Sequence, residues 1–143
     1  MKAKKFYLAG PMTGVPQFNY PAFDAACEAL RARGVDVVSP AELDDLATRA
    51  EALASPDGKL VDGKSAGHTW GDFLSRDVKI VADECTGIIL MPGWEKSRGA
   101  KLEAYVGLLC GHEFHEYVGD GFTSPIPASH VSLMVWENTR TWE

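Results

Sequence analysis

The sequence of 143 residues lacks the glycine motifs of the common nucleotide-binding folds. It contains neither the GxGxxG pattern of dinucleotide-binding domains nor the GxxxxGK[ST] pattern of phosphate-binding loops. It also lacks an apolar run long enough to span a bilayer, and the apolar stretch after Lys5 is too short for a signal peptide. These absences disfavour common dinucleotide and nucleoside triphosphate sites. We expect a cytoplasmic protein with no membrane partner.

Basic residues and cysteines are scarce. The 14 Lys and Arg residues against 20 Asp and Glu give a net charge of -6, so we expect no nucleic acid partner. Cys27, Cys85 and Cys110 lie in apolar surroundings without CxxC spacing, which predicts buried, reduced thiols. His112 and His115 would share a face only in a helix, not in a strand. We therefore expect no metal site, and no cofactor.

The apolar residues predict one α/β domain over residues 1–143. A hydrophobic content of 45% in a chain of this length supports a substantial core. Apolar runs predict buried strands at 5–9, 35–38 and 88–91. Between the first two, Asn19 is placed to cap a helix. Strand, helix and strand in this order form a right-handed unit with parallel strands.

The remaining elements complete this pattern. Residues 41–54 and 70–83 have helical composition, whereas the Pro, Gly and Ser content of 55–69 predicts a loop or lid insertion without a stable fold of its own. The C-terminal part predicts a half-buried strand, a loop, and a final strand or short helix, at 112–118, 119–127 and 131–136. We therefore expect a mostly parallel sheet of four or five strands with helices on both faces.

The stretch from 87 to 105 has the clearest functional pattern. Its strand leads through a loop to Ser97, a natural N-cap, and the small first turn with Arg98 and Gly99 lets a ligand approach the backbone amides. Open α/β sheets bind ligands where a strand ends at a helix N-terminus. Glu103 follows, with only small or apolar neighbours one turn away. It is either a functional carboxylate or a solvated one.

Two other segments supply candidate residues. Asp77 shares a helical ridge with Trp70 and Phe73 and follows Arg76, so its carboxylate is desolvated with a raised pKa, partnered, or exposed on the helix shoulder. The loop after the first strand is rich in turn residues whose amides can meet a ligand. Its candidates are Gly10, Pro11, Met12, Thr13 and Gly14.

Three segments resemble a known family. They are YLAGPMTG at 7–14, RDVKIVADEC at 76–85 and SRGAKLEAYVGLLCG at 97–111, and together they resemble the nucleoside 2-deoxyribosyltransferase superfamily. They resemble in particular its small uncharacterised phage and bacterial branch, which is related to deoxynucleoside 5′-monophosphate N-glycosidases. The resemblance implies a flavodoxin-like (Rossmann-like) three-layer sandwich. It also implies a homodimer or larger homo-oligomer that acts on a small-molecule nucleoside or nucleotide.

The resemblance also implies roles for three residues. Glu103 would be the nucleophile that attacks the anomeric carbon, Asp77 would contact the base or sugar, and Tyr7 would hold Glu103. These roles fit the chemistry, because cleavage of an N-glycosidic bond needs an anion at the anomeric carbon and a proton for the leaving base. Three aromatic residues are candidates for stacking on the base, and equally for core packing: Phe18, Tyr20 and Trp94.

Position 97 distinguishes two activities within the superfamily. A serine six residues before the glutamate is typical of its nucleotide hydrolases, so Ser97 followed by Arg98 favours an N-glycosidase of nucleoside 5′-monophosphates. The alternatives are a nucleoside 2-deoxyribosyltransferase, a non-catalytic nucleotide-binding or sensor module and, ranked last, a dinucleotide glycohydrolase. Trp136 and Trp142 are candidate interface residues, together with the strand at 112–118.

Overall fold

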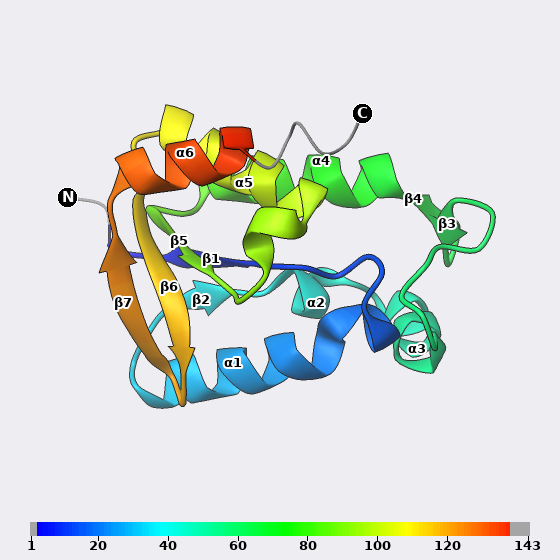
Figure 1. The fold of residues 1–143 in the computed structure, drawn as a ribbon. Coiled ribbons are helices and arrows are strands. Elements are labelled where there is room, and N and C mark those ends of the chain that lie inside the picture. Colours follow the sequence, from blue (N-terminus) through cyan, green and yellow to red (C-terminus); the bar gives the residue numbers. More distant parts are fainter. Residues whose placement is uncertain (1–2, 138–143) are drawn as a thin grey trace.

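In the computed structural model, which describes residues 3–137, the chain forms an α/β fold of three layers (Figure 1). The central sheet has five strands in the order β2-β1-β5-β6-β7. These strands are β1 (Phe6–Ala9), β2 (Val37–Val38), β5 (Gly87–Leu90), β6 (Glu113–Gly119) and β7 (Phe122–Ile126). The architecture confirms the expected flavodoxin-like sandwich.

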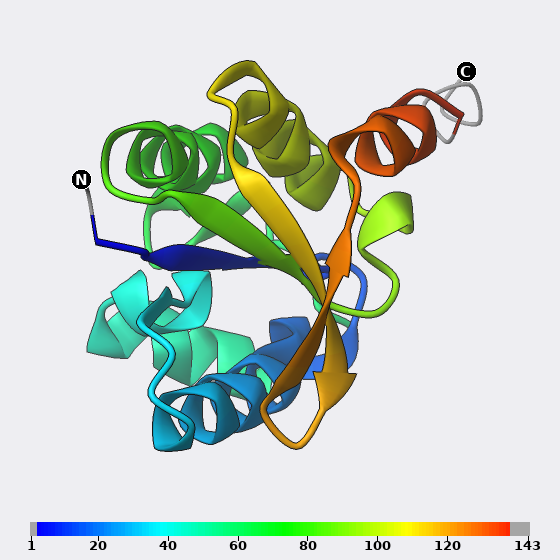
Figure 2. The same cartoon turned by 90° about the vertical axis from the view of Figure 1, so that its left-hand side faces the viewer.

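Helices cover both faces of this sheet (Figures 1 and 2). One layer contains α1 (Tyr20–Ala32), α2 (Pro40–Leu43) and α3 (Leu46–Ala54). The other contains α4 (Trp70–Asp83), α5 (Arg98–Leu109) and α6 (Ala128–Glu137). The helix expected at 70–83 is confirmed, and α6 shows that the last apolar run is a helix. No helix within residues 3–137 is long and apolar enough to cross a membrane.

Three of the four strand pairs of the central sheet are parallel, and the fourth corrects an expectation. β1 pairs in parallel with β2 and β5, and β5 pairs in parallel with β6. The loop expected at 119–127 is wrong, because β7 pairs antiparallel with β6. Pro125 is tolerated there because β7 is an edge strand of the sheet.

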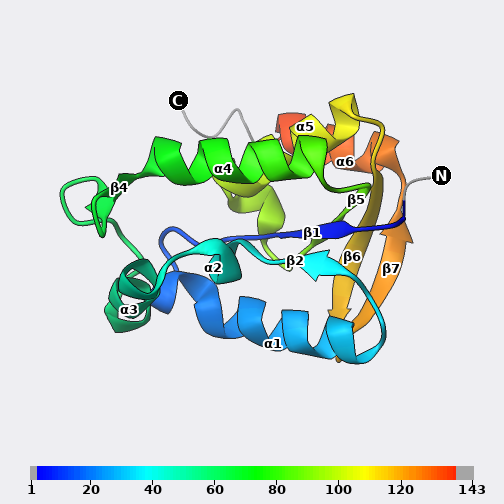
Figure 3. The same ribbon diagram turned by 180° about the vertical axis from the view of Figure 1, so that it is seen from behind.

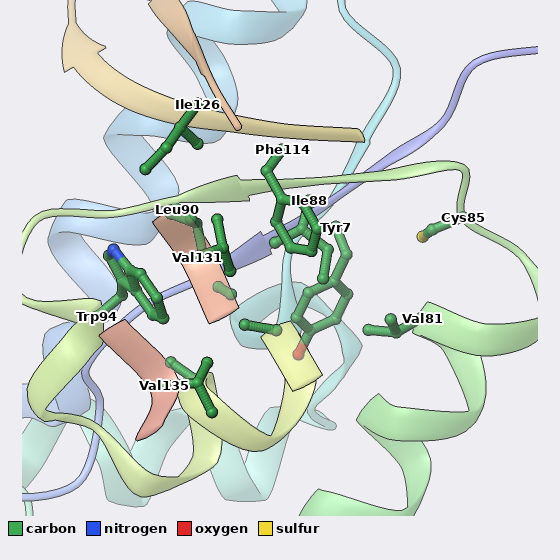
Figure 4. Packing of buried hydrophobic residues seen from close by; sticks show 13 residues of the cluster. Tyr7, Val81, Cys85, Ile88, Leu90, Trp94, Phe114, Ile126, Val131 and Val135 are labelled. Carbon is green, nitrogen blue, oxygen red and sulfur yellow. The ribbon is translucent and has the colours of Figure 1, made fainter. Parts of the chain in front are cut away.

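Side chains of the two central strands alternate between two cores. Tyr7, Ile88 and Leu90 belong to the core beneath α4, α5 and α6 (Figure 4). Leu8 and Ile89 belong to the core beneath α1. Both faces of these strands are therefore buried, which explains why their sequences are continuous apolar runs and not alternating patterns.

Local hydrogen bonds decide how two helices begin. The helix expected between the first two strands is present as α1, with Asn19 at its N-cap position and at the end of the 3-10 turn η1 (Pro16–Asn19). The Asn19 side chain does not cap the helix, however, because its amide donates to the Pro11 carbonyl at 2.9 Å. The single helix expected at 41–54 is wrong. Asp45 is extended and its carboxylate accepts from the Thr48 amide at 2.8 Å, so it starts a new helix, α3.

The segment 55–69, here named the cover segment, has a defined structure, contrary to expectation. It leads from α3 to α4 and contains two short antiparallel strands, β3 (Lys64–Ser65) and β4 (His68–Thr69) (Figure 3). The Glu51 carboxylate accepts from the Ser65 hydroxyl at 3.0 Å and the Ala66 amide at 2.6 Å. The Gly14 amide donates to the Gly58 carbonyl at 2.8 Å. These long-range bonds fix a segment that local propensity leaves undefined.

Gly58→Ala is expected to detach the cover segment from the loop that contains Gly14 and Val15. Gly58 has φ +67°, and an added Cβ would lie 1.9 Å from the Val15 carbonyl oxygen. We expect a loss of about 1–3 kcal/mol in local stability, measured as faster limited proteolysis and amide exchange within 55–69. Gly63→Ala is the matched control, because φ is +72° there but no atom lies within 4 Å. Equal cleavage of the two variants would contradict the contact with Val15.

The cysteines differ in exposure. Cys27 and Cys85 are buried as predicted, and burial raises the pKa of the Cys27 thiol to about 12. Cys110 is exposed, contrary to prediction, because it lies at the C-terminal cap of α5, beyond the part of the helix that packs on the sheet.

Candidate functional site

A cavity of about 670 Å³ is lined by residues that follow the carboxyl ends of β1 and β5. From β1 the chain continues to β2 on one side of the sheet, whereas β5 lies on the other side of β1. The loops after β1 and β5 therefore diverge, as at the ligand sites of other open α/β sheets. Lining residues from these two connections are Gly10, Met12, Thr13, Lys96, Ser97, Arg98 and Gly99.

Glu103 lies on α5 and lines this cavity, although only 6% of its surface is exposed. The fully buried Tyr7 on β1 donates a hydrogen bond from its hydroxyl to Glu103 Oε2 at 2.5 Å. Burial raises the pKa of Glu103 well above its usual value, and the charge of Asp77 raises it further. The hydrogen bond from Tyr7 opposes both effects. The structure therefore places a desolvated carboxyl group, oriented by a hydrogen bond from Tyr7, at the cavity wall.

Asp77 lines the same cavity from α4 and is buried and partnered at once. Its Oδ1 accepts from Arg76 Nε at 2.9 Å. Burial raises the pKa of Asp77, whereas the Arg76 charge lowers it. Because the charge of Asp77 raises the pKa of Glu103, the two carboxyl groups interact with each other beside one guanidinium. Such a pair can hold one proton while keeping one negative charge.

Asp44 is a third buried carboxylate at the cavity. It lies in the break between α2 and α3, and 5% of its side chain is exposed. It accepts from Arg76 Nη1 at 2.5 Å and from the Tyr20 hydroxyl. Burial raises the pKa of Asp44, and Arg76 lowers it. Arg76 is therefore shared between two carboxylates.

Aromatic and basic side chains line other parts of the cavity. The aromatic residues are Phe18, Tyr20, Trp70 and Phe73, and the basic residues besides Arg76 are Lys59, Lys96 and Arg98. The Arg98 guanidinium lies 5.6 Å from the centroid of the Trp70 ring. The Ser97 hydroxyl accepts from the Ala100 amide at 3.2 Å, which confirms Ser97 as the N-cap of α5. A helix N-terminus with basic side chains beside it favours an anionic ligand group.

Three of the residues predicted to bind substrate lie elsewhere. Trp94 is 2% exposed and packs in the core with Leu90, Val131 and Val135 (Figure 4), so its predicted stacking on a ligand is wrong. Pro11 and Gly14 do not line the cavity. Their backbone groups instead bond to other parts of the protein, the Pro11 carbonyl to Asn19 and the Gly14 amide to Gly58.

The structure also adds residues that the sequence did not single out. Asp44, and Lys59, Leu60 and Ser65 of the cover segment, line the cavity. The consecutive acids Asp44 and Asp45 were the one available signal, because two helix-breaking acids inside a helical stretch indicate a break. Nothing in the sequence showed which of the two is buried.

The arrangement of the His, Cys, Asp and Glu side chains in residues 3–137 does not indicate a metal site. Within the described residues 3–137, no group of three His, Cys, Asp or Glu side chains is arranged to hold a metal ion. His112 contacts the Val81 carbonyl at 2.7 Å, and His115 pairs with Glu113 at 2.9 Å.

The structure is that of an α/β protein with Tyr7, Asp77 and Glu103 buried at the cavity beyond the carboxyl ends of β1 and β5. Residues 4–115 match the model of a family described as a domain of unknown function (DUF4406), and the chain belongs to this family. The match includes Tyr7, Asp77 and Glu103 and ends within β6. No curated protein matches the chain.

Proposed function

We propose that this protein cleaves the N-glycosidic bond of deoxynucleosides or their 5′-monophosphates, with Glu103 as the nucleophile. The observation that supports this most strongly is the buried hydrogen bond between Tyr7 and Glu103, beside Asp77, at the wall of the cavity. A glutamate that served only as a solvated surface residue would be exposed, whereas Glu103 is buried and accepts a hydrogen bond from the Tyr7 hydroxyl. The resemblance to the nucleoside 2-deoxyribosyltransferase superfamily assigns the same three residues to this chemistry.

The proposed reaction has two steps. The Glu103 carboxylate attacks the anomeric carbon as the bond to the base breaks, and the bonding electrons leave with the base nitrogen, which takes a proton from Asp77. Water then attacks the same carbon, its proton goes to a site carboxylate, and the sugar is released from Glu103. These steps require the proton of the carboxyl pair to lie on Asp77 when Glu103 attacks as a carboxylate, although burial raises the pKa of Glu103.

The basic residues favour a substrate with a 5′-phosphate. Lys59, Lys96 and Arg98 line the cavity with the N-terminus of α5, although the chain as a whole is acidic. A phosphate would meet helix amides and cations there, six residues before Glu103 along the chain. This arrangement favours a nucleotide N-glycosidase over a nucleoside 2-deoxyribosyltransferase.

Chromatography of reaction mixtures tests the proposal. The purified protein is incubated with each deoxynucleoside and each deoxynucleoside 5′-monophosphate, with and without a second free base. Free base from the monophosphates is the expected result, whereas a new nucleoside formed only with a second base would establish a transferase. If no substrate reacts but a nucleotide raises the melting temperature of the protein, the protein is a nucleotide-binding module and the proposed enzymatic function is wrong.

Tyr7→Phe is expected to lower kcat by about 10- to 100-fold with little change in KM, because it removes the donor that orients Glu103. The hydrogen bond from Tyr7 lowers the pKa of Glu103, so its loss raises that pKa. The acidic limb of the pH–rate profile should therefore move to higher pH. Tyr105→Phe, on the same helix as Glu103, is the matched control and should leave the profile in place. An unmoved limb in Tyr7→Phe would contradict the assigned role.

We also propose that the protein forms a homodimer or larger homo-oligomer. Exposed apolar residues lie on α5 and α6, and Trp136 packs its ring edge against Tyr105 at 5.7 Å between centroids. The exposed residues are Leu102, Leu109, Leu133 and Trp136. Trp142, the other tryptophan predicted for an interface, lies outside the described residues.

A further inference from the structure

The Arg76 guanidinium is held by three groups from two parts of the chain. Its Nη1 donates to Asp44, its Nε donates to Asp77, and its Nη2 reaches the Pro40 carbonyl at 3.4 Å. Asp44 and Pro40 come from the connection after β2, whereas Arg76 and Asp77 come from α4. The guanidinium thus bridges the two helical layers at the cavity.

This bridge divides one positive charge between two carboxylates. Paired with Arg76 alone, Asp77 would be strongly favoured in its ionised form, because the half-buried guanidinium of Arg76 is always charged. Asp44 competes for the same charge at the shorter distance, 2.5 Å against 2.9 Å. It also adds a negative charge near Asp77, which raises the pKa of Asp77.

We propose that Asp44 is a positioning residue for the glycosidic reaction: by engaging Arg76, it leaves Asp77 able to hold the proton that the departing base requires. The inference rests on the proposed function, in which Asp77 is the proton donor. Asp44 does not deliver the proton itself. Its effect reaches the reacting groups through Arg76 and through its own charge.

Other charged and titratable groups face these carboxylates and must stay unchanged in a test. Asp77 is influenced by Arg76 and Asp44, and by Tyr7 and Glu103 from β1 and α5. Asp44 is influenced by Arg76, by Arg49 on α3 and by the neighbouring Asp45, and it accepts from Tyr20. A substitution of Asp44 by an uncharged isostere changes one charge within this set.

The test is Asp44→Asn, read by the pH dependence of kcat/KM and by carboxyl ¹³C NMR titration of Asp77 and Glu103. With Asp44 neutral, Arg76 acts on Asp77 alone, so the pair loses its proton at lower pH. We expect the alkaline limb of the profile, and the titration of the Asp77 signal, to move down by about one pH unit.

Asp83→Asn is the matched control on the same helix, since it removes an exposed carboxylate paired with Lys79 at 2.6 Å. If Asp44→Asn does not fold, Asp44→Ser removes the same charge with less bulk. A folded variant with lower activity at every pH, an unmoved limb and unmoved carboxyl signals would overturn the inference. The NMR titration needs no turnover, so it separates this result from a wild type that releases no base, which would overturn the proposed function.

Discussion

Glu103→Gln should reduce the release of free base by at least about 10³-fold, because the amide cannot form the covalent bond to the anomeric carbon. Gln retains the shape of Glu and an acceptor for the Tyr7 hydroxyl, so binding of the substrate should persist. The measurement is the initial rate, by chromatography, with the nucleoside or nucleotide that the wild type cleaves. Glu116→Gln changes an exposed carboxylate on β6 and is the matched control. Full activity in Glu103→Gln would remove Glu103 from the mechanism.

The stability of Glu103→Gln relative to the wild type should increase with pH. Burial raises the pKa of Glu103 in the folded protein above its unfolded value. Glu103 therefore contributes most to stability below its unfolded pKa, and this contribution is lost as the pH rises through its folded pKa. Gln does not titrate. We expect the Tm of the variant, relative to wild type, to be a few degrees higher at pH 8 than at pH 4. A constant difference would show that Glu103 is not desolvated.

Trp94→Ala should destabilise the fold by about 3–5 kcal/mol, the usual loss for a large aromatic side chain removed from a core. Trp94 is 2% exposed and fills the space between β5 and α6, against Leu90 and Val135. Urea unfolding followed by circular dichroism measures the loss. The same substitution should affect ligand binding only through stability.

Trp70→Ala is the informative contrast. Trp70 is 42% exposed, lines the cavity and lies beneath the Arg98 guanidinium. We expect a change in unfolding free energy below about 1 kcal/mol, with weaker nucleotide binding. If instead Trp94→Ala left stability intact and weakened binding, Trp94 would be a ligand contact after all.

Much of the fold followed from apolar runs and their order. The parallel strands, the helix at 70–83 and the N-cap at Ser97 depend on local pattern, and each is present. The errors arose where a distant partner decides the structure. β7 exists because β6 lies beside it, and the cover segment is fixed by Glu51 and Gly14. Periodicity within a segment contains no information on such partners.

The candidate site divides in the same way. The sequence could single out Glu103 and Asp77 because each carboxylate has apolar neighbours on its own helix, where an unpartnered charge is unfavourable. The structure places both residues at the cavity. The resemblance to a known superfamily added Tyr7, and the structure places its hydroxyl on Glu103. Asp44 was not predictable, because its partner Arg76 is 32 residues away in sequence. Trp94 was misassigned because a tryptophan after a strand is compatible with both a core and a ligand wall.

The position of Tyr7 has a consequence for how the site responds to fluctuations. Tyr7 lies on β1, which pairs with strands on both sides and is buried on both faces, so its amides should exchange hydrogen only through global unfolding. The cover segment has two-residue strands and few buried apolar contacts, so it should open at much lower free energy. If a ligand enters by opening of the cover segment, the hydrogen bond between Tyr7 and Glu103 should stay in place, because neither residue belongs to that segment.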